Sequence, residues 1–418
     1  MARIIQAAFL AMSLLLPASS PAGSVERARA DRVAQAGDDI AAARAWPDPR
    51  PFAEPGQKAR RTVARPAASA GAASAEDTAR FLAGMQPSPD SPLAALTRDW
   101  GWLQHAGFFD RAFGALDRTQ LAKIRAWSGA QLRTRRPAMF YMFSGPDFLY
   151  ADAFFPAAST YVLAGLEPVG QIPDVLNMPR GSIGPSLRNI AGSLHTILNF
   201  SFFKTHNMRM ELNSGRLGGA VPILYVFLAR AGKTVRDASL VALDQDGVEQ
   251  PDGPRVKSAA HGVKIVFTDQ DGRTQTLYYF STNLANDGVG NSGILKFCER
   301  LGAGDSLIKS ASYLLHSGKF SKIRDFLLAH SASILQDDSG IPVNDFDRKK
   351  WQLQPFGQYR GPVDVFPQNY QPRLRELFQK ANPIPMGFGV GYRWRPQESN
   401  LLLAVRKDAD TAGAAAAP

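Results

Sequence analysis

Residues 263–280, Val-Lys-Ile-Val-Phe-Thr-Asp-Gln-Asp-Gly-Arg-Thr-Gln-Thr-Leu-Tyr-Tyr-Phe, carry a clear fold signal. Two runs rich in β-branched and aromatic residues, 263–267 and 275–280, flank the polar segment Asp269-Gln-Asp-Gly272. This arrangement predicts a β-hairpin, because Asp and Gly readily adopt the backbone angles of a tight turn. An antiparallel pair of strands is therefore expected here.

Further strands are expected on both sides of this hairpin. Residues 221–229 and 239–243 predict a second hairpin that turns at Ala231-Gly-Lys233. Short apolar runs bounded by Gly or Pro, typical of strands, occur at 138–143 and 160–166, and the C-terminal third adds runs at 334–335, 351–356, 386–394 and 401–405.

Helical periodicity appears in three other regions. Residues 91–132 predict an N-terminal helical hairpin, with one helix after Ser91-Pro92 and a second from Asp117 or Thr119. A helix after Pro185 places Leu187, Ile190, Leu194, Ile197 and Leu198 on one face, and residues 294–327 continue the helical pattern through Leu307 and Leu314. Runs of helices and runs of strands predict an α+β fold with a mainly antiparallel sheet and packed helices.

The N-terminus has the order of a secretory signal peptide. Arg3 precedes an apolar run from Ile4 to Leu16, and small residues follow up to a predicted cleavage site after Ala22. The apolar run has 13 residues, whereas a membrane-spanning helix needs roughly 20. We therefore expect residues 1–22 to be removed and the protein to be periplasmic or secreted.

Composition divides the rest of the chain. Residues 23–75 are rich in Ala, Arg and Pro and predict a disordered linker, because they offer too little apolar surface to compensate the entropy of ordering. Residues 76–410 are expected to form a single α+β domain, with candidate sub-boundaries near 137 and 290, before a disordered tail at 411–418. Cys298 is the only cysteine, so no internal disulfide can form.

The charge pattern argues against nucleic-acid binding. The net charge is +11, but dense basic clusters after residue 76 occur only at 133–136 and 348–350, and solvated helix ends or loops explain both. A weak contact with an anionic membrane or cell-wall surface remains compatible with this charge.

Common catalytic signatures are absent from the sequence. It contains no G-x-S-x-G, no H-E-x-x-H and no cluster of cysteines, and it indicates neither a metal site nor a particular cofactor. Ser306-Leu-Ile-Lys309 matches the S-x-x-K of penicillin-binding proteins, but the accompanying motifs are missing or out of order, so an ordinary helix start is the preferred interpretation.

One candidate binding site lies on the helix after Pro185. His195, Asn199, Phe202 and His206 recur at helical spacing beside the apolar face. His195 and Asn199, one turn apart, could share a water, a metal or a substrate oxygen. The alternative is that each side chain bridges neighbouring backbone groups at the edge of the core.

Two acidic segments provide the other candidates. Asp147, in Ser144-Gly-Pro-Asp, closes an expected strand, and Asp152 follows five residues later. Asp337 and Asp338 follow another expected strand, and Ser310, Ser312 and His316 are expected to face the same loop. Carboxylates held in such loops can act as acid and base, although ordinary turns are the preferred interpretation of both segments.

The segments 309–316 and 334–342, together with Trp351 and Pro355-Phe-Gly-Gln-Tyr359, resemble the shared core of a family of exported bacterial proteins to which no function is assigned. The resemblance covers roughly residues 95–406. It implies one co-inherited architecture and assigns no role to any residue.

Two main functions remain open from the sequence, besides a surface or matrix protein that residues 23–75 tether to an anionic partner. The first is an exported envelope protein that binds a small molecule or an envelope component, without catalysis, between the Pro185 helix and the sheet. The second is a periplasmic hydrolase of an envelope polymer or small ester, with His195 or Asp147 as base and Asp338 in the same cleft.

Overall fold

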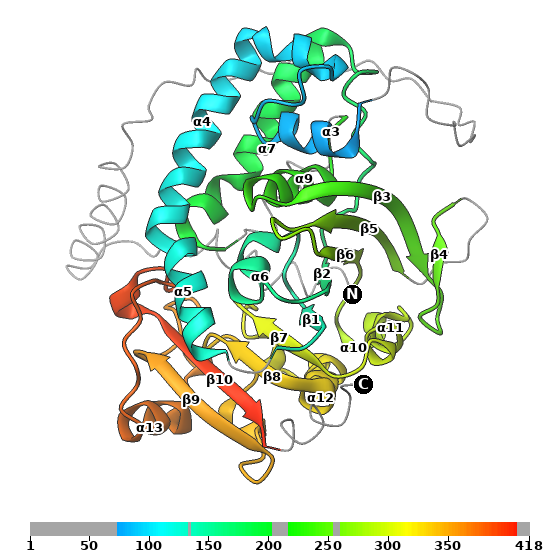
Figure 1. The fold of residues 1–418 in the computed structure, drawn as a ribbon. Coiled ribbons are helices and arrows are strands. Elements are labelled where there is room, and N and C mark those ends of the chain that lie inside the picture. The colour runs from blue at the N-terminus through cyan, green and yellow to red at the C-terminus, as the bar shows by residue number, and fades with distance from the viewer. Residues whose placement is uncertain (1–72, 133–134, 203–215, 254–259, 408–418) are drawn as a thin grey trace, which may run out of the picture. The chain divides into compact units, whose positions relative to one another are not determined.

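A ten-stranded mixed β-sheet, in the order β4-β3-β5-β6-β2-β1-β7-β8-β10-β9, organises the fold (Figure 1). The computed structural model describes residues 73–132, 135–202, 216–253 and 260–407. The predicted signal peptide, nearly all of the predicted linker, the C-terminal tail and His206 lie outside these ranges. The helices and the large sheet confirm the predicted α+β fold.

The centre of the sheet is parallel and its two sides are antiparallel. The parallel strands are β6 (Thr274–Ser281), β2 (Thr160–Gly165), β1 (Ala138–Tyr141), β7 (Gly304–Ile308) and β8 (Ser331–Gln336). Beside β6 lie β5 (Ala260–Thr268), β3 (Thr234–Leu243) and β4 (Glu249–Pro251); beside β8 lie β10 (Asn400–Arg406) and β9 (Trp351–Gly357). The hairpin expected at 263–280 forms as β5 and β6, whereas the parallel centre was not expected.

Helices cover both faces of the sheet. One apolar cluster joins the sheet to α3 (Ala75–Leu82), α4 (Trp100–Leu116), α5 (Ala122–Gln131), α6 (Phe148–Phe154), α7 (Arg180–Phe200) and α9 (Ala220–Arg230). A second cluster joins it to α10 (Asn286–Val289), α11 (Ile294–Arg300) and α12 (Ser321–His330). In β1, Met139 and Tyr141 belong to the first cluster, and Ala138 and Phe140 to the second. Alternate residues of a strand point to opposite faces, so both faces of β1 are buried.

Shorter elements complete the described chain. Helix α13 (Pro372–Lys380) packs beside β9 through Leu374 and Phe378. Single 3-10 turns occur at η1 (Pro92–Arg98), η3 (Leu314–His316), η4 (Gly318–Phe320), η5 (Val343–Asp345), η6 (Pro367–Asn369) and η7 (Pro396–Glu398). Among the described residues, no helix is long and apolar enough to cross a membrane.

Strand β1 marks a change of direction in the winding of the sheet. The chain leaves β1 through α6 and enters β2 on one side, and it later returns through α10 and α11 to place β7 on the other side. The loops that follow β1 and β7 therefore run in opposite directions from the carboxyl ends of these two strands. In open α/β sheets, ligands bind at such a topological switch point.

Two segments adopt the opposite secondary structure from that predicted. Residues 220–230 form helix α9, not a strand, and its residues from Ala220 to Ala229 are all buried. A helix that is apolar on every side gives no periodic signal, so its sequence resembles that of a buried strand. Conversely, β7 replaces the helix expected around Leu307, because a strand buried between two parallel neighbours lacks polar alternation.

Two further predictions need correction. The expected N-terminal hairpin is one interrupted helix, since α4, a π-helical turn η2 (Asp117–Leu121) and α5 follow one another with helical backbone angles at their junctions. The strand expected at 386–394 is a loop with isolated bridges. Its glycines permit close backbone contact: a Cβ added at Gly389 would lie 1.7 Å from the Trp394 carbonyl oxygen.

Candidate functional site

Loops at the carboxyl ends of β1, β7 and β8 gather buried polar side chains at the switch point. Asp147 follows β1, Lys309 follows β7, and Asp337 and Asp338 follow β8. We call this set of loops the carboxyl edge. Asp147, Asp337 and Asp338 lie at the same edge because neighbouring parallel strands end on the same side of a sheet. The sequence had indicated two separate candidate sites for them.

An ion pair crosses the switch point. Lys309 Nζ lies 2.8 Å from Asp147 Oδ2, and each side chain is only 2% exposed. The Tyr141 hydroxyl donates to the same carboxylate oxygen over 2.9 Å, and Asp147 Oδ1 accepts the Tyr150 backbone N–H at the start of α6. Burial, with the negative charge of Asp147, raises the pKa of Tyr141, so this tyrosine stays protonated and donates. The pair thus fixes the loops after β1 and β7 to each other.

Lys309 also connects the sheet to helix α7. Its ammonium donates to the backbone carbonyl of Ser201, at the C-terminal end of α7, and lies 3.8 Å from the centre of the Tyr150 ring. A carbonyl at a helix C-terminus and the face of an aromatic ring both stabilise a cation. The Lys309 ammonium therefore contacts a carboxylate, a backbone carbonyl and an aromatic ring at once.

Asp337 occupies the centre of the loop after β8. Its Oδ1 accepts the Ser339 N–H at 3.0 Å and the Ser339 hydroxyl at 2.5 Å, and its Oδ2 accepts the Ser310 N–H at 2.9 Å. Burial and the neighbouring charge of Asp338 raise the pKa of Asp337 to about 6. A carboxyl group with such a pKa can accept or release a proton near neutral pH.

Asp338 points away from Asp337 into a separate set of hydrogen bonds. It accepts the Tyr313 hydroxyl at 2.7 Å and the Asn400 side-chain amide at 3.0 Å. Burial raises the pKa of Asp338, while these donors oppose the rise. Its two carboxylate oxygens are engaged, which suits a structural role in joining β7, β8 and β10.

Ser310, in the loop after β7, combines a left-handed backbone with a buried hydroxyl. It has a left-handed φ of +55°, as do nearby Ser312 at +51° and Tyr313 at +54°. Each such residue costs about 1–3 kcal/mol and tends to occur at functional sites. The Ser310 Oγ is buried without a hydrogen-bond partner among the described residues, which costs roughly 1–3 kcal/mol more.

The loop 386–395 covers Ser310 and Asp337. Tyr392 donates its hydroxyl to the Ser310 carbonyl at 2.9 Å and lies 2.8 Å from the Ser312 hydroxyl. A Cβ added at Gly391 would lie 2.0 Å from Asp337 Oδ2 and 3.1 Å from Ser310 Oγ. The backbone of the covering loop therefore reaches both side chains only because residue 391 is a glycine.

Glu167 is a candidate that sequence reasoning missed. It follows β2, is 2% exposed, and lies so close to Gly165 that a Cβ there would be 2.3 Å from its Oε2. It stands 22 residues after Gly145, which has a left-handed φ of +55° in the loop after β1. In nucleotide-binding sheets an acidic residue about 20 residues after the first turn contacts the ribose hydroxyls. The signal was present as Gly-Leu-Glu-Pro at the end of an expected strand.

The candidate residues predicted on the Pro185 helix have different surroundings. His195 and Asn199 are exposed on α7, and the Asn199 amide donates to the His195 carbonyl at 2.8 Å, one turn earlier. The amide nitrogen also lies 3.4 Å from His195 Nδ1. The predicted proximity of His195 and Asn199 is therefore present. Phe202 instead packs against Tyr392, with ring centres 5.1 Å apart.

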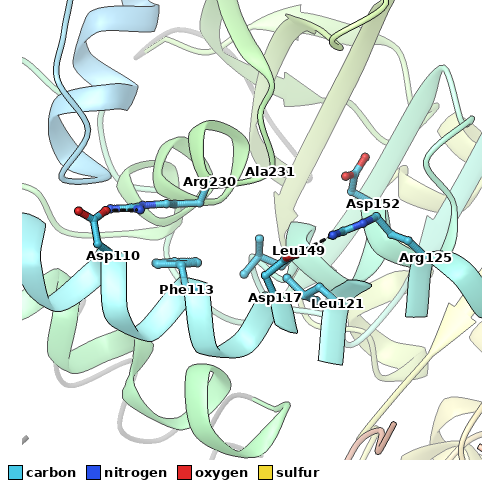
Figure 2. Close-up of a pocket in the computed structure, with 10 residues that line it drawn as sticks. Asp110, Phe113, Asp117, Leu121, Arg125, Leu149, Asp152, Arg230 and Ala231 are labelled. Carbon is cyan, nitrogen blue, oxygen red and sulfur yellow. Dashed lines mark hydrogen bonds and ion pairs between the residues drawn. The ribbon is translucent and has the colours of Figure 1, made fainter. Parts of the chain in front are cut away.

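Asp152 borders a different cavity. It pairs with Lys233 at 2.8 Å and helps to line a cleft of about 240 Å³ between α4, α5, α6 and the end of α9. Figure 2 shows the Asp110–Arg230 and Asp117–Arg125 ion pairs in this cleft. Burial raises the pKa of Asp152, and Lys233 opposes the rise.

The Ser306–Lys309 match to the S-x-x-K motif forms no Ser–Lys pair. Ser306 is buried in β7 and its hydroxyl lies 2.7 Å from that of Ser331, while Lys309 pairs with Asp147.

Among the described residues, no group of three or more His, Cys, Asp and Glu side chains is placed to hold a metal ion. No protein-family model, curated protein or solved structure matches the chain.

Proposed function

We propose that this protein binds a small, uncharged molecule with neighbouring hydroxyl groups, such as ribose or another sugar, at the carboxyl edge. The observation that carries the proposal is the Lys309–Asp147 ion pair, which joins the two loops of the switch point with both side chains 2% exposed. A buried ion pair contributes little net stability, so it is better explained as a device that fixes the geometry of a site.

The sheet itself supports a ligand at this position. The order β6-β2-β1-β7-β8 of its parallel strands equals the order of the first five strands in doubly wound nucleotide-binding sheets. In such sheets the ligand lies beyond the carboxyl ends of the strands, where Glu167 and Asp337 are found. A fold by itself does not determine a function, so the chemistry of the residues at this edge must also favour a ligand.

The charges of the carboxyl edge favour an uncharged ligand. Among the described residues, the carboxyl edge contains the carboxylates of Asp147, Glu167, Asp337 and Asp338, and its buried cation Lys309 is paired with Asp147. Asp147 also caps α6, at the kind of helix start where a phosphate binds in other proteins. Carboxylates accept hydrogen bonds from hydroxyl groups but repel phosphates, so sugar hydroxyls suit this edge better than nucleotides do.

The proposal can be tested with adenosine, 2′-deoxyadenosine, adenosine monophosphate, ribose and N-acetylglucosamine in a thermal-shift titration. A ligand at 100 times its dissociation constant stabilises the fold by about 2.7 kcal/mol. We expect an uncharged sugar or nucleoside to raise the melting temperature, and the Glu167→Gln variant to weaken this effect. The matched control is Asp152→Asn, which lies in the separate cleft.

Two outcomes contradict the proposal. One is that no uncharged member of the panel changes the melting temperature of a protein that melts cooperatively. The other is that adenosine monophosphate binds more tightly than adenosine, since this would mean that the carboxyl edge attracts rather than repels phosphate.

Export remains part of the proposal. The signal-peptide pattern of residues 1–22 supports a periplasmic or secreted location, where free and polymeric sugars are available ligands. Mass spectrometry of the chain expressed from its own start codon in a bacterial host should find an N-terminus near residue 23. A chain that begins at residue 1 or 2 would contradict export.

A basic groove supports the expected contact with an anionic surface. This groove of about 370 Å³ is lined by the apolar side chains of Val343, Phe346 and Leu377 and by Arg348, Arg373 and Lys380, of which Lys380 pairs with Glu376, also in the lining. Clustered cations beside apolar side chains attract anionic polymers and lipid headgroups. The Arg348→Glu variant should therefore bind less to vesicles that contain phosphatidylglycerol, and unchanged binding would remove the idea.

A further inference from the structure

We propose that Ser310 is a nucleophile and that the carboxyl edge hydrolyses esters, with Asp337 as the acceptor of the serine proton. The proposal goes beyond ligand binding and rests on the same site: its substrate class is an O-acylated sugar or another small ester. It replaces His195 and Asp147 as candidate bases.

The backbone around Ser310 has the form that presents a nucleophile. Ser310 lies two residues after β7, has a left-handed φ, and is followed within four residues by the short helical turn η3. In serine hydrolases a strained turn from a strand to a helix places the serine Oγ at the carboxyl end of a sheet. Small residues on the C-terminal side, Ala311 and Ser312, leave room for this sharp turn.

The Ser310 hydroxyl makes no hydrogen bond to the described residues. The Ser310 backbone N–H binds Asp337, its carbonyl accepts the Tyr392 hydroxyl, and only the Oγ lacks a partner. By contrast, the neighbouring Ser312 and Ser339 hydroxyls are both hydrogen-bonded. A buried hydroxyl without a partner, on a strained backbone, calls for an explanation in function.

Asp337 is placed to accept the proton. Its Oδ2 is 2.9 Å from the Ser310 backbone nitrogen, and this oxygen and Ser310 Oγ both lie within 3.1 Å of a Cβ built on Gly391. Staggered rotation about the serine χ1 angle can bring the hydroxyl towards this oxygen. Asp147 is less suitable, because its carboxylate is already engaged by Lys309 and Tyr141.

The chemical steps balance with water as the second substrate. The Ser310 Oγ attacks the ester carbonyl and gives its proton to Asp337. The bond between the carbonyl carbon and the alcohol oxygen then breaks, and the proton passes from Asp337 to the departing alcohol. Water next attacks the acyl-serine, releases the carboxylic acid and returns the proton to Ser310. The covering loop 386–395 must move to admit the ester, since Gly391 lies directly against both side chains.

The test is covalent labelling of the full chain with a fluorophosphonate, followed by peptide mass spectrometry. We expect one adduct, on Ser310, and its loss in the Ser310→Ala variant. The Asp337→Asn variant should label roughly 100-fold more slowly, because a positioned base contributes at least this factor. The control is Ser333→Ala in β8, whose buried hydroxyl donates to Asp305 and which should label at the rate of the wild type.

Melting temperatures test the unpartnered Ser310 hydroxyl without any substrate or covalent probe. Because the Ser310 hydroxyl is buried without a partner, Ser310→Ala should melt at or above the wild-type temperature, whereas Ser312→Ala should melt below it. Absence of an adduct on Ser310 in wild-type protein that melts cooperatively would overturn the proposal. So would an adduct whose rate is unchanged in Asp337→Asn. Neither result affects the test of sugar binding, which uses melting shifts and no covalent probe.

Discussion

The buried ion pair between Lys309 and Asp147 makes a sharp prediction about stability. Replacement of Lys309 by Met keeps most of the apolar stem but removes the ammonium, leaving the Asp147 carboxylate without its cation at 2% exposure. Breaking a buried pair in this way costs about 3–5 kcal/mol. The Tyr141 hydroxyl and the Tyr150 N–H still bind Asp147, so we expect the lower end, about 3 kcal/mol.

The assay is equilibrium urea denaturation of the purified chain, followed by circular dichroism. The matched control is Lys296→Met, which removes a lysine paired with Asp246 at nearly the same distance, 2.7 Å, but with both side chains largely exposed. This control should leave the midpoint almost unchanged, because water and salt screen an exposed pair.

A second variant separates the ion pair from other effects of the substitution. In the double variant Lys309→Met, Asp147→Asn, the uncompensated charge is gone, so the loss should be smaller than the sum of the two single losses. The reasoning is refuted if Lys309→Met loses no more stability than Lys296→Met. It is also refuted if the two single losses simply add.

Three further predictions concern the core. Burial lowers the pKa of His105 to about 4, against about 6.5 in the unfolded chain. As the pH falls from 6.5 to 4, the unfolded chain therefore binds a proton that the folded chain does not, and the folded state loses stability. Urea denaturation across this pH range should show the free energy of unfolding of the wild type falling by about 3 kcal/mol more than that of His105→Gln. Burial also raises the pKa of Cys298, so a chromogenic thiol reagent should react only after denaturant unfolds the chain, and rapid reaction of the native protein would show an exposed thiol. Phe154→Ala should lower the free energy of unfolding, measured by urea denaturation, by about 3–5 kcal/mol, because the Phe154 ring is fully buried. The control Trp100→Ala should change this free energy little, because Trp100 is 72% exposed. Equal losses in the two variants would contradict this difference in burial.

Local sequence signals determined the fold class and several elements. The hairpin at 263–280, the strands at 351–356 and 401–405, and the helix that carries Leu187 and Leu194 form as predicted, because turn residues and apolar periodicity act over a few neighbouring residues. The continuation of α4 through a π-helical turn was not predicted, because Asp117 is a favoured N-cap residue and indicated the start of a new helix.

The candidate site could be predicted only as separate pieces. Asp147, Asp337 and Asp338 were recognised as acidic residues after strands, but nothing local indicates that they converge. They are brought together because β1, β7 and β8 are parallel neighbours, although β7 lies more than 160 residues after β1. Lys309 was misinterpreted for the same reason, since its strand was expected to be a helix.

The sequence by itself therefore determined the α+β class, the hairpin at 263–280 and the acidic loop residues, all of which depend on short-range patterns. Only the tertiary structure decided the parallel centre of the sheet, the Lys309–Asp147 pair and the strained Ser310, whose Oγ has no hydrogen-bond partner among the described residues. The physical reason is that pairing between distant strands depends on burial of both sheet faces at once. The apolar sequence pattern of such a strand does not indicate which other strand it will pair with.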